Sequence, residues 1–222
     1  MTIILKFSKI KNNGFLFYER NKKFVKFFYN VKKKNNNYFK NELKGYKWYF
    51  GQLKKNKLTP AINIKKNKFE ISVLKGKSFK HWENLINNKI LINKVIEHYL
   101  DFWPQKKISP FHGDLTIENI IFQKNNDPII VDWEDFDSRQ IWGLDICYFL
   151  ISLIVLPALT KKKNISNSSL KSFSLIWKKF FEGKNFSYLR DPVEYIKKIK
   201  KRRNFFYKIS DKMKYRIYNE IL

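Results

Sequence analysis

The feature that most restricts the fold of this chain is a change of hydrophobic pattern along its length. Residues 3–10, 15–20 and 23–29 are strand-like and are separated by short turns rich in asparagine. Residues 38–53 carry apolar side chains at three- and four-residue spacing, which indicates a helix. Strands are predicted again at 63–64 and 68–74. The first part of the chain should therefore form a small antiparallel sheet with one helix.

The pattern after Gly76 is mainly helical. We predict a helix over residues 85–99, a short strand pair at 120–122 and 128–133, and helices from Leu144 onward. The expected fold class is therefore α+β. Gly76 marks the expected boundary between an N-terminal lobe, residues 1–76, and a mostly helical C-terminal lobe, residues 77–222.

The longest apolar stretch, Ile146 to Leu159, has 14 residues. A membrane-spanning helix needs about 20, and Asp145 precedes the stretch while Pro157 lies near its end, so we expect a buried helix. The single cysteine, Cys147, lies inside it and excludes an intramolecular disulfide. A buried, reduced thiol and the lack of export-signal features at the N-terminus together indicate a cytoplasmic location.

The formal net charge is +27, which suits nucleotides, nucleic acid or an anionic membrane as partners. Lysine is spread along the whole chain, so biased composition explains the charge equally well. No RNA-binding or zinc-finger pattern occurs, and no nucleic-acid partner is expected. Residues 195–213 have the pattern of a basic amphipathic helix, which either packs on the core or makes peripheral contact with an anionic membrane or glycolipid.

The most informative segment is residues 111–119, FHGDLTIEN, followed by IIF and then by IIVDWE at residues 129–134. It puts Asp114 and Asn119 five residues apart in a tight loop and Asp132 at the end of an apolar strand. Phosphoryl transfer needs such a set: one carboxylate to orient and deprotonate a hydroxyl, and oxygen ligands that hold Mg²⁺ against the phosphates.

This arrangement resembles the aminoglycoside-phosphotransferase and choline-kinase superfamily of small-molecule kinases, in its His-x-Asp-x-x-x-x-Asn loop and in Asp-Trp-Glu after an apolar run. The resemblance implies a two-lobed, protein-kinase-like fold and ATP and Mg²⁺ as cofactors. It assigns Asp114 as the catalytic base and Asn119 and Asp132 as metal ligands. It also implies that Glu134 contacts a second metal ion.

Two further residues are expected to support the loop. Gly143-Leu144-Asp145 resembles the family segment whose carboxylate holds the catalytic loop from the start of a helix. His112 is expected to pack and hydrogen-bond the loop rather than to act as a base. Ordinary turn chemistry would explain any one of these residues, but not the whole set in order.

The N-terminal part should contain the nucleotide site that the resemblance implies. Lys26, in the middle of the strand predicted at residues 23–29, would contact the α- and β-phosphates, and Glu42, on the next helix, would pair with it. Lys22 and Lys23 are rivals for this role, and a solvated lysine and glutamate are the ordinary alternative.

Neither a Gly-x-Gly-x-x-Gly loop nor a Walker-type P-loop occurs, which excludes P-loop enzymes. The expected activity is phosphorylation of a hydroxyl on a small molecule: a sugar or glycan, an amino alcohol or an aminoglycoside-like compound. A basic protein matches an acidic glycan better than a polycationic aminoglycoside. The alternative is a catalytically silent, kinase-like binding protein.

Overall fold

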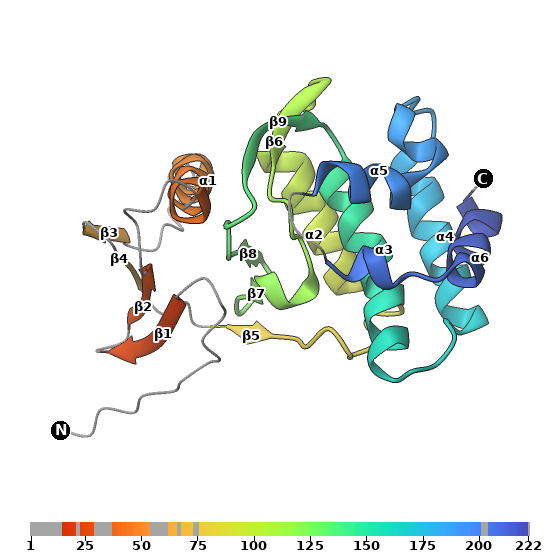
Figure 1. Ribbon diagram of the computed structural model, residues 1–222, viewed down its shortest axis with the longest axis horizontal. Coiled ribbons are helices and arrows are strands. Elements are labelled where there is room, and N and C mark those ends of the chain that lie inside the picture. The colour runs from red at the N-terminus through yellow and green to blue at the C-terminus, as the bar shows by residue number, and fades with distance from the viewer. Residues whose placement is uncertain are drawn as a thin grey trace. The chain divides into compact units, whose positions relative to one another are not determined.

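The computed structural model describes residues 15–20, 23–28, 37–53, 62–65, 68–72, 76–200 and 204–221. The chain divides into two compact units (Figure 1). One comprises residues 1–76 together with Trp133–Phe136, and the other comprises Lys77–Asp132 and Asp137–Leu222. The Asp-Trp-Glu motif therefore spans the division between the units.

The N-terminal unit contains a four-stranded antiparallel sheet and one helix. Its elements are β1 Phe15–Arg20, β2 Lys23–Phe28, α1 Asn37–Leu53, β3 Ile62–Lys65 and β4 Lys68–Ser72. The strand order is β1-β2-β4-β3, so β2 is a central strand. The strands and the helix predicted from residue 15 onward are confirmed, whereas the strand predicted at 3–10 lies outside the described residues.

Helix α1 packs tightly on the segment Trp133–Phe136 of its own unit. The ring centroids of Tyr49 and Trp133 lie 5.0 Å apart, and those of Trp48 and Phe136 lie 6.1 Å apart. Gly45 makes this packing possible, because a Cβ atom there would lie 2.6 Å from the Cβ atom of Trp133. Helix α1 can therefore lie this close to Trp133 of the motif only because residue 45 has no side chain.

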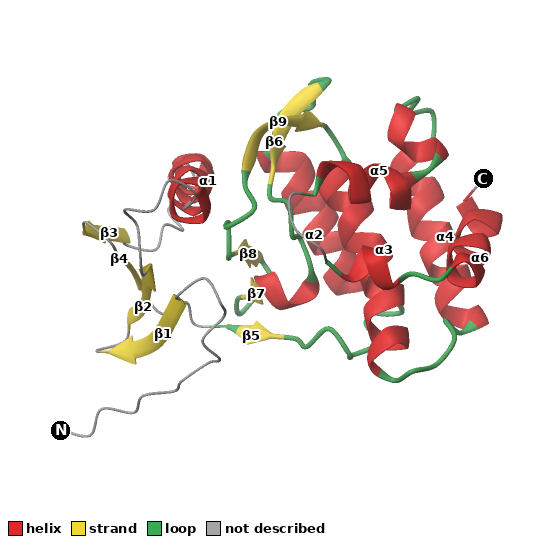
Figure 2. Cartoon of the chain, viewed as in Figure 1, coloured by secondary structure: helices red, strands yellow, loops and turns green. Residues whose placement is uncertain are grey.

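The C-terminal unit is mostly helical (Figure 2). Its long helix α3, Leu144–Thr160, is buried along nearly its whole length, which confirms the buried helix; Pro157 lies within it. Among the described residues, no helix is both long and apolar enough to cross a membrane. The remaining helices are α2 Lys89–Phe102, α4 Asn167–Phe181, α5 Pro192–Ile199 and α6 Asp211–Ile221, with short 3-10 turns η2 Ile117–Asn119, η3 Ser187–Arg190 and η4 Phe205–Lys208.

Two small antiparallel sheets contain the strands that flank residues 112–119. They consist of β5 Lys77–Ser78, β7 Ile120–Phe122 and β8 Pro128–Ile130 in the order β5-β7-β8, and of β6 Ile108–Phe111 paired with β9 Asp137–Ile141. The predicted strand pair corresponds to β7 and β8, but β8 ends before Val131. Mixed α+β content with small antiparallel sheets confirms the predicted fold class and is compatible with a kinase-like fold.

Two helix predictions need correction. Helix α2 begins at Lys89 rather than at Leu85, because the side chain of Asn88 caps it by accepting a hydrogen bond from the Leu91 amide at 3.3 Å. The single amphipathic helix predicted over 195–213 is wrong: α5 ends at Ile199 and Lys200 has extended backbone angles. The Asn204 side chain then caps the separate turn η4.

Candidate active site

The loop between β6 and η2 is fixed by a carboxylate at the start of α3. Asp145 accepts the backbone N–H of His112 at 3.1 and 2.9 Å through its two oxygens, and that of Gly113 at 3.2 Å. Burial raises the pKa of Asp145 to about 7, although both backbone donors oppose the rise. Gly113 has φ of +85°, a conformation that favours glycine.

His112 joins this loop to the segment after β8. Its Nε2 atom lies 2.9 Å from the carbonyl oxygen of Val131, and its Nδ1 atom lies 3.2 Å from the Asp114 amide nitrogen. Because a carbonyl only accepts, Nε2 carries the proton and Nδ1 accepts from the amide. Burial lowers the pKa of His112, which favours this neutral form. Both ring nitrogens are therefore occupied in holding backbone.

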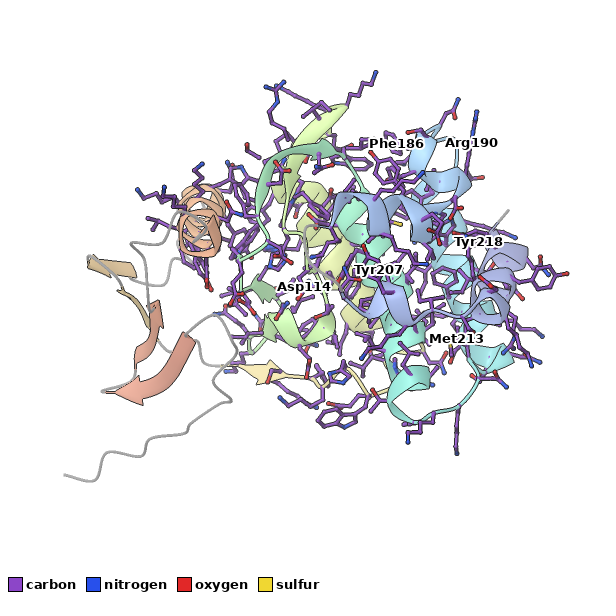
Figure 3. The ribbon with its side chains drawn as sticks, in the orientation of Figure 1. Asp114, Phe186, Arg190, Tyr207, Met213 and Tyr218 are labelled. Carbon is purple, nitrogen blue, oxygen red and sulfur yellow. The ribbon has the colours of Figure 1, made fainter. Side chains whose placement is uncertain are left out.

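Asp114, which is labelled in Figure 3, is half-buried, and its carboxylate accepts hydrogen bonds from two side chains. Its Oδ1 atom accepts a hydrogen bond from the Tyr148 hydroxyl at 2.6 Å. Its Oδ2 atom accepts one from Asn119 Nδ2 at 3.3 Å, and the same amide nitrogen donates to the Asp114 carbonyl oxygen at 2.7 Å. Each carboxylate oxygen keeps lone-pair capacity for a further donor, such as a substrate hydroxyl.

Asn119 and Asp132 are brought near each other by one backbone hydrogen bond. The Val131 amide donates to the Asn119 carbonyl oxygen at 2.9 Å, so Asp132 follows the residue paired with Asn119. The Asn119 side-chain nitrogen is turned toward Asp114, which makes its Oδ1 the atom able to bind a cation. An amide oxygen and a carboxylate are ligands that Mg²⁺ accepts.

Asp132 lies in the left-handed backbone region, with φ of +67°. Aspartate, asparagine and glycine tolerate this region better than other residues do. Strained backbone of this kind clusters at functional sites, where surrounding structure holds it in place.

Two acidic residues come together in the N-terminal unit. Glu42 on α1 and Glu134 are both buried, and their carboxylate groups have oxygen atoms within 4.8 Å of each other. Two such carboxylates could hold a cation. The predicted partner of Glu42, Lys26, lies in β2 with its backbone opposite Phe69, and its side chain is outside the described part of the chain. The Lys26–Glu42 pair stays a prediction.

Sequence reasoning missed two residues at the loop, Tyr148 and Lys200. Tyr148 is hidden in an apolar run, although its position three residues after Asp145 puts it on the same face of α3. Lys200 is one lysine among many, yet its ammonium group is buried and donates a hydrogen bond to the Gly113 carbonyl oxygen. No local pattern indicates that contact, because 87 positions separate the two residues.

Part of the chain is similar to a known protein family. Residues 74–139 match the family model described as the phosphotransferase enzyme family, APH. The matched region contains the whole loop and the Asp-Trp-Glu motif, and it agrees with the resemblance to aminoglycoside phosphotransferases and choline kinases. No match was found among curated proteins.

Proposed function

We propose that this protein is a kinase that uses ATP and Mg²⁺ to phosphorylate a hydroxyl group of a small molecule. The similarity of residues 74–139 to the phosphotransferase family supports phosphoryl transfer in general. The geometry of the loop is the observation that supports a Mg²⁺-dependent kinase. The Asn119 side chain donates a hydrogen bond to Asp114, and the Asn119 carbonyl oxygen accepts one from the amide of Val131, the residue before Asp132.

Asp114 is proposed as the base. Its carboxylate would accept the hydrogen bond of the substrate hydroxyl, orient that oxygen toward the γ-phosphate and take its proton. The contacts from Tyr148 and Asn119 hold the carboxylate in one orientation. Positioning of this kind supplies much of the rate acceleration in phosphoryl transfer.

Asn119 and Asp132 are proposed to hold Mg²⁺, which when bound neutralises charge on the β- and γ-phosphates. Glu134 is proposed to contact a second ion. Lys26 and Glu42 are proposed to serve the nucleotide, with residues 1–76 as the nucleotide-binding lobe and 77–222 as the catalytic and substrate lobe.

The proposed class of phosphate acceptor rests on the net charge of the protein. A net charge of +27 favours an acidic or phosphorylated glycan over an aminoglycoside-like cation, with sugars and amino alcohols as neutral alternatives. Exposed Lys208 and Lys212 near the C-terminal end of the chain would also support peripheral contact with an anionic membrane or glycolipid. The buried free thiol of Cys147 fits the proposed cytoplasmic location.

The experiment is an acceptor screen. ADP release from ATP is measured with and without Mg²⁺ against sugars, amino alcohols and acidic glycan-core fragments. The proposal predicts Mg²⁺-dependent transfer to at least one hydroxyl acceptor and slow transfer to water. Mg²⁺-dependent ATP binding with no transfer to any acceptor or to water would instead support the catalytically silent alternative.

A further inference from the structure

The peptide unit that leads into Asp114 is held on both sides. The Asp114 amide donates to His112 Nδ1 at 3.2 Å, and the Gly113 carbonyl oxygen accepts a hydrogen bond from the Lys200 ammonium group. Because glycine adopts many backbone conformations, its φ of +85° does not by itself fix the plane of the Gly113–Asp114 peptide. We propose that Lys200 is a positioning residue for Asp114, acting through the Gly113 carbonyl and through Tyr148.

The Lys200 ammonium group also contacts the ring of Tyr148. The Lys200 nitrogen lies 5.4 Å from the ring centroid, within cation–π range. The hydroxyl of the same ring donates to Asp114 Oδ1 at 2.6 Å. One buried ammonium group therefore contacts two of the groups that position the Asp114 carboxylate: the preceding peptide and the Tyr148 side chain, which is hydrogen-bonded to it.

The C-terminal segment supports Tyr148 from a second point. The ring centroids of Phe206 and Phe205, in η4, lie 4.9 and 5.4 Å from that of Tyr148. Lys200 itself is 8% exposed, and the backbone turns to an extended conformation there, immediately after α5. Residues that sequence reasoning assigned to a basic helix thus pack on the side chain bonded to Asp114.

The charge of Lys200 also favours the protonation states that the loop requires. Burial has the largest effect on the pKa of both neighbours, raising that of Asp145 to about 7 and lowering that of His112. The Lys200 charge lowers both pKa values. It therefore helps keep Asp145 ionised, as an acceptor for two amides, and His112 neutral, with an unprotonated Nδ1 that accepts from the Asp114 amide.

This inference rests on the proposed function, and its test separates the two. The variants are Lys200→Met, which keeps length and apolar bulk but removes the ammonium, Lys200→Arg, which restores a cationic donor, and Lys198→Met, a matched exposed control two positions away. Two quantities are measured: hydrolysis of Mg·ATP with water as acceptor, and amide hydrogen exchange of the peptide that contains residues 112–116.

We expect Lys200→Met to lower kcat on the order of 10- to 100-fold, as for a misplaced catalytic group, with the KM for ATP changed less than about 2-fold. Lys200→Arg should recover part of that loss, and Lys198→Met should match wild type. Tyr148→Phe should also lower kcat, and the Lys200→Met/Tyr148→Phe double variant should lose less than the product of the single losses, because both act on one carboxylate. Exchange at 112–116 should be faster in Lys200→Met than in the control.

The inference is overturned if Lys200→Met retains wild-type kcat in a preparation whose hydrolysis is abolished by Asp114→Asn; the proposed function then stands. If Asp114→Asn has no effect on hydrolysis, the proposed function fails instead. Hydrogen exchange tests, independently of turnover, whether Lys200 holds the backbone of residues 112–116. Unchanged protection of these amides in Lys200→Met overturns the inference, and a loss of protection confined to them supports it.

Discussion

Gly45 provides a direct test of how the Asp-Trp-Glu motif is anchored. In Gly45→Ala the new Cβ atom would lie 2.6 Å from the Trp133 Cβ atom and 2.9 Å from two atoms of its ring system. Trp133 is fully buried, with ring contacts at 5.7 Å to Trp48 and 5.0 Å to Tyr49, so the tryptophan cannot move without disturbing its neighbours.

The change in the free energy of unfolding expected for Gly45→Ala is the result of two opposing effects. Overpacking of a filled core costs about 1–3 kcal/mol, whereas glycine to alanine inside a helix gains up to about 1 kcal/mol. Gly51 lies on the same helix, and beyond its own stretch of helix no atom of the described residues lies within 4 Å of an added Cβ atom, so Gly51→Ala should bring only the gain. The free energy of unfolding should therefore differ between the two variants by about 1–3 kcal/mol, with Gly51→Ala the more stable.

The assay is urea unfolding of wild type and both variants, followed by calorimetric titration with Mg·ATP. Gly45→Ala should also bind Mg·ATP more weakly, because Trp133 is covalently flanked by the proposed ligands Asp132 and Glu134. Gly51→Ala should bind as wild type does. Equal stabilisation by both alanines would refute the close approach of α1 to Trp133.

Two further predictions concern Asp145 and Asp132. Since the folded pKa of Asp145, about 7, is above its ordinary value of 3.8, the folded protein binds the extra proton, and stability should fall as pH rises from about 4 to about 7. Asp145→Asn should remove the contribution of this carboxyl group, which lowers the free energy of unfolding by on the order of 4 kcal/mol between pH 4 and pH 7. Urea unfolding of wild type and variant at pH 4, 5.5 and 7 measures that difference. The same pH dependence in both proteins would contradict the raised pKa of Asp145. Asp132→Asn should keep its stability, because asparagine tolerates the left-handed backbone, while losing Mg²⁺-dependent ATP binding; Asp132→Ala should lose that binding and also about 1–2 kcal/mol of stability. Unchanged Mg·ATP affinity in both variants would argue against Asp132 as a ligand.

A loop at residues 112–119 could be predicted because the residues that indicate it are close together in the sequence, whereas the roles of its side chains stay predictions. Asp114 and Asn119 are five residues apart, and the strand that follows the loop, β7, consists of apolar residues. Strands β6 and β9 were missed because one contains Pro110 and the other is polar, so neither shows the alternation of a half-buried strand.

The contacts that complete the site could not be predicted, because they depend on tertiary structure. Lys200 reaches Gly113 from the far end of the chain, and Tyr148 reaches Asp114 from a helix that looks like simple core. The single helix predicted at 195–213 was also wrong because tertiary structure overrides the local pattern. Apolar residues keep helical spacing through this segment, but the structure has the end of helix α5, an extended Lys200 and the 3-10 turn η4 there.

The central claim, that Asp114 is the base of a phosphotransferase, is tested most directly by comparing Asp114→Asn with Asp101→Asn, an exposed aspartate on α2. Phosphate transfer from Mg·ATP to the best acceptor of the screen, or to water, is measured together with ATP affinity. We predict that Asp114→Asn lowers kcat by about 10²–10⁴-fold while ATP affinity and folding stay unchanged, and that Asp101→Asn matches wild type. Near-normal turnover in Asp114→Asn would contradict the assignment.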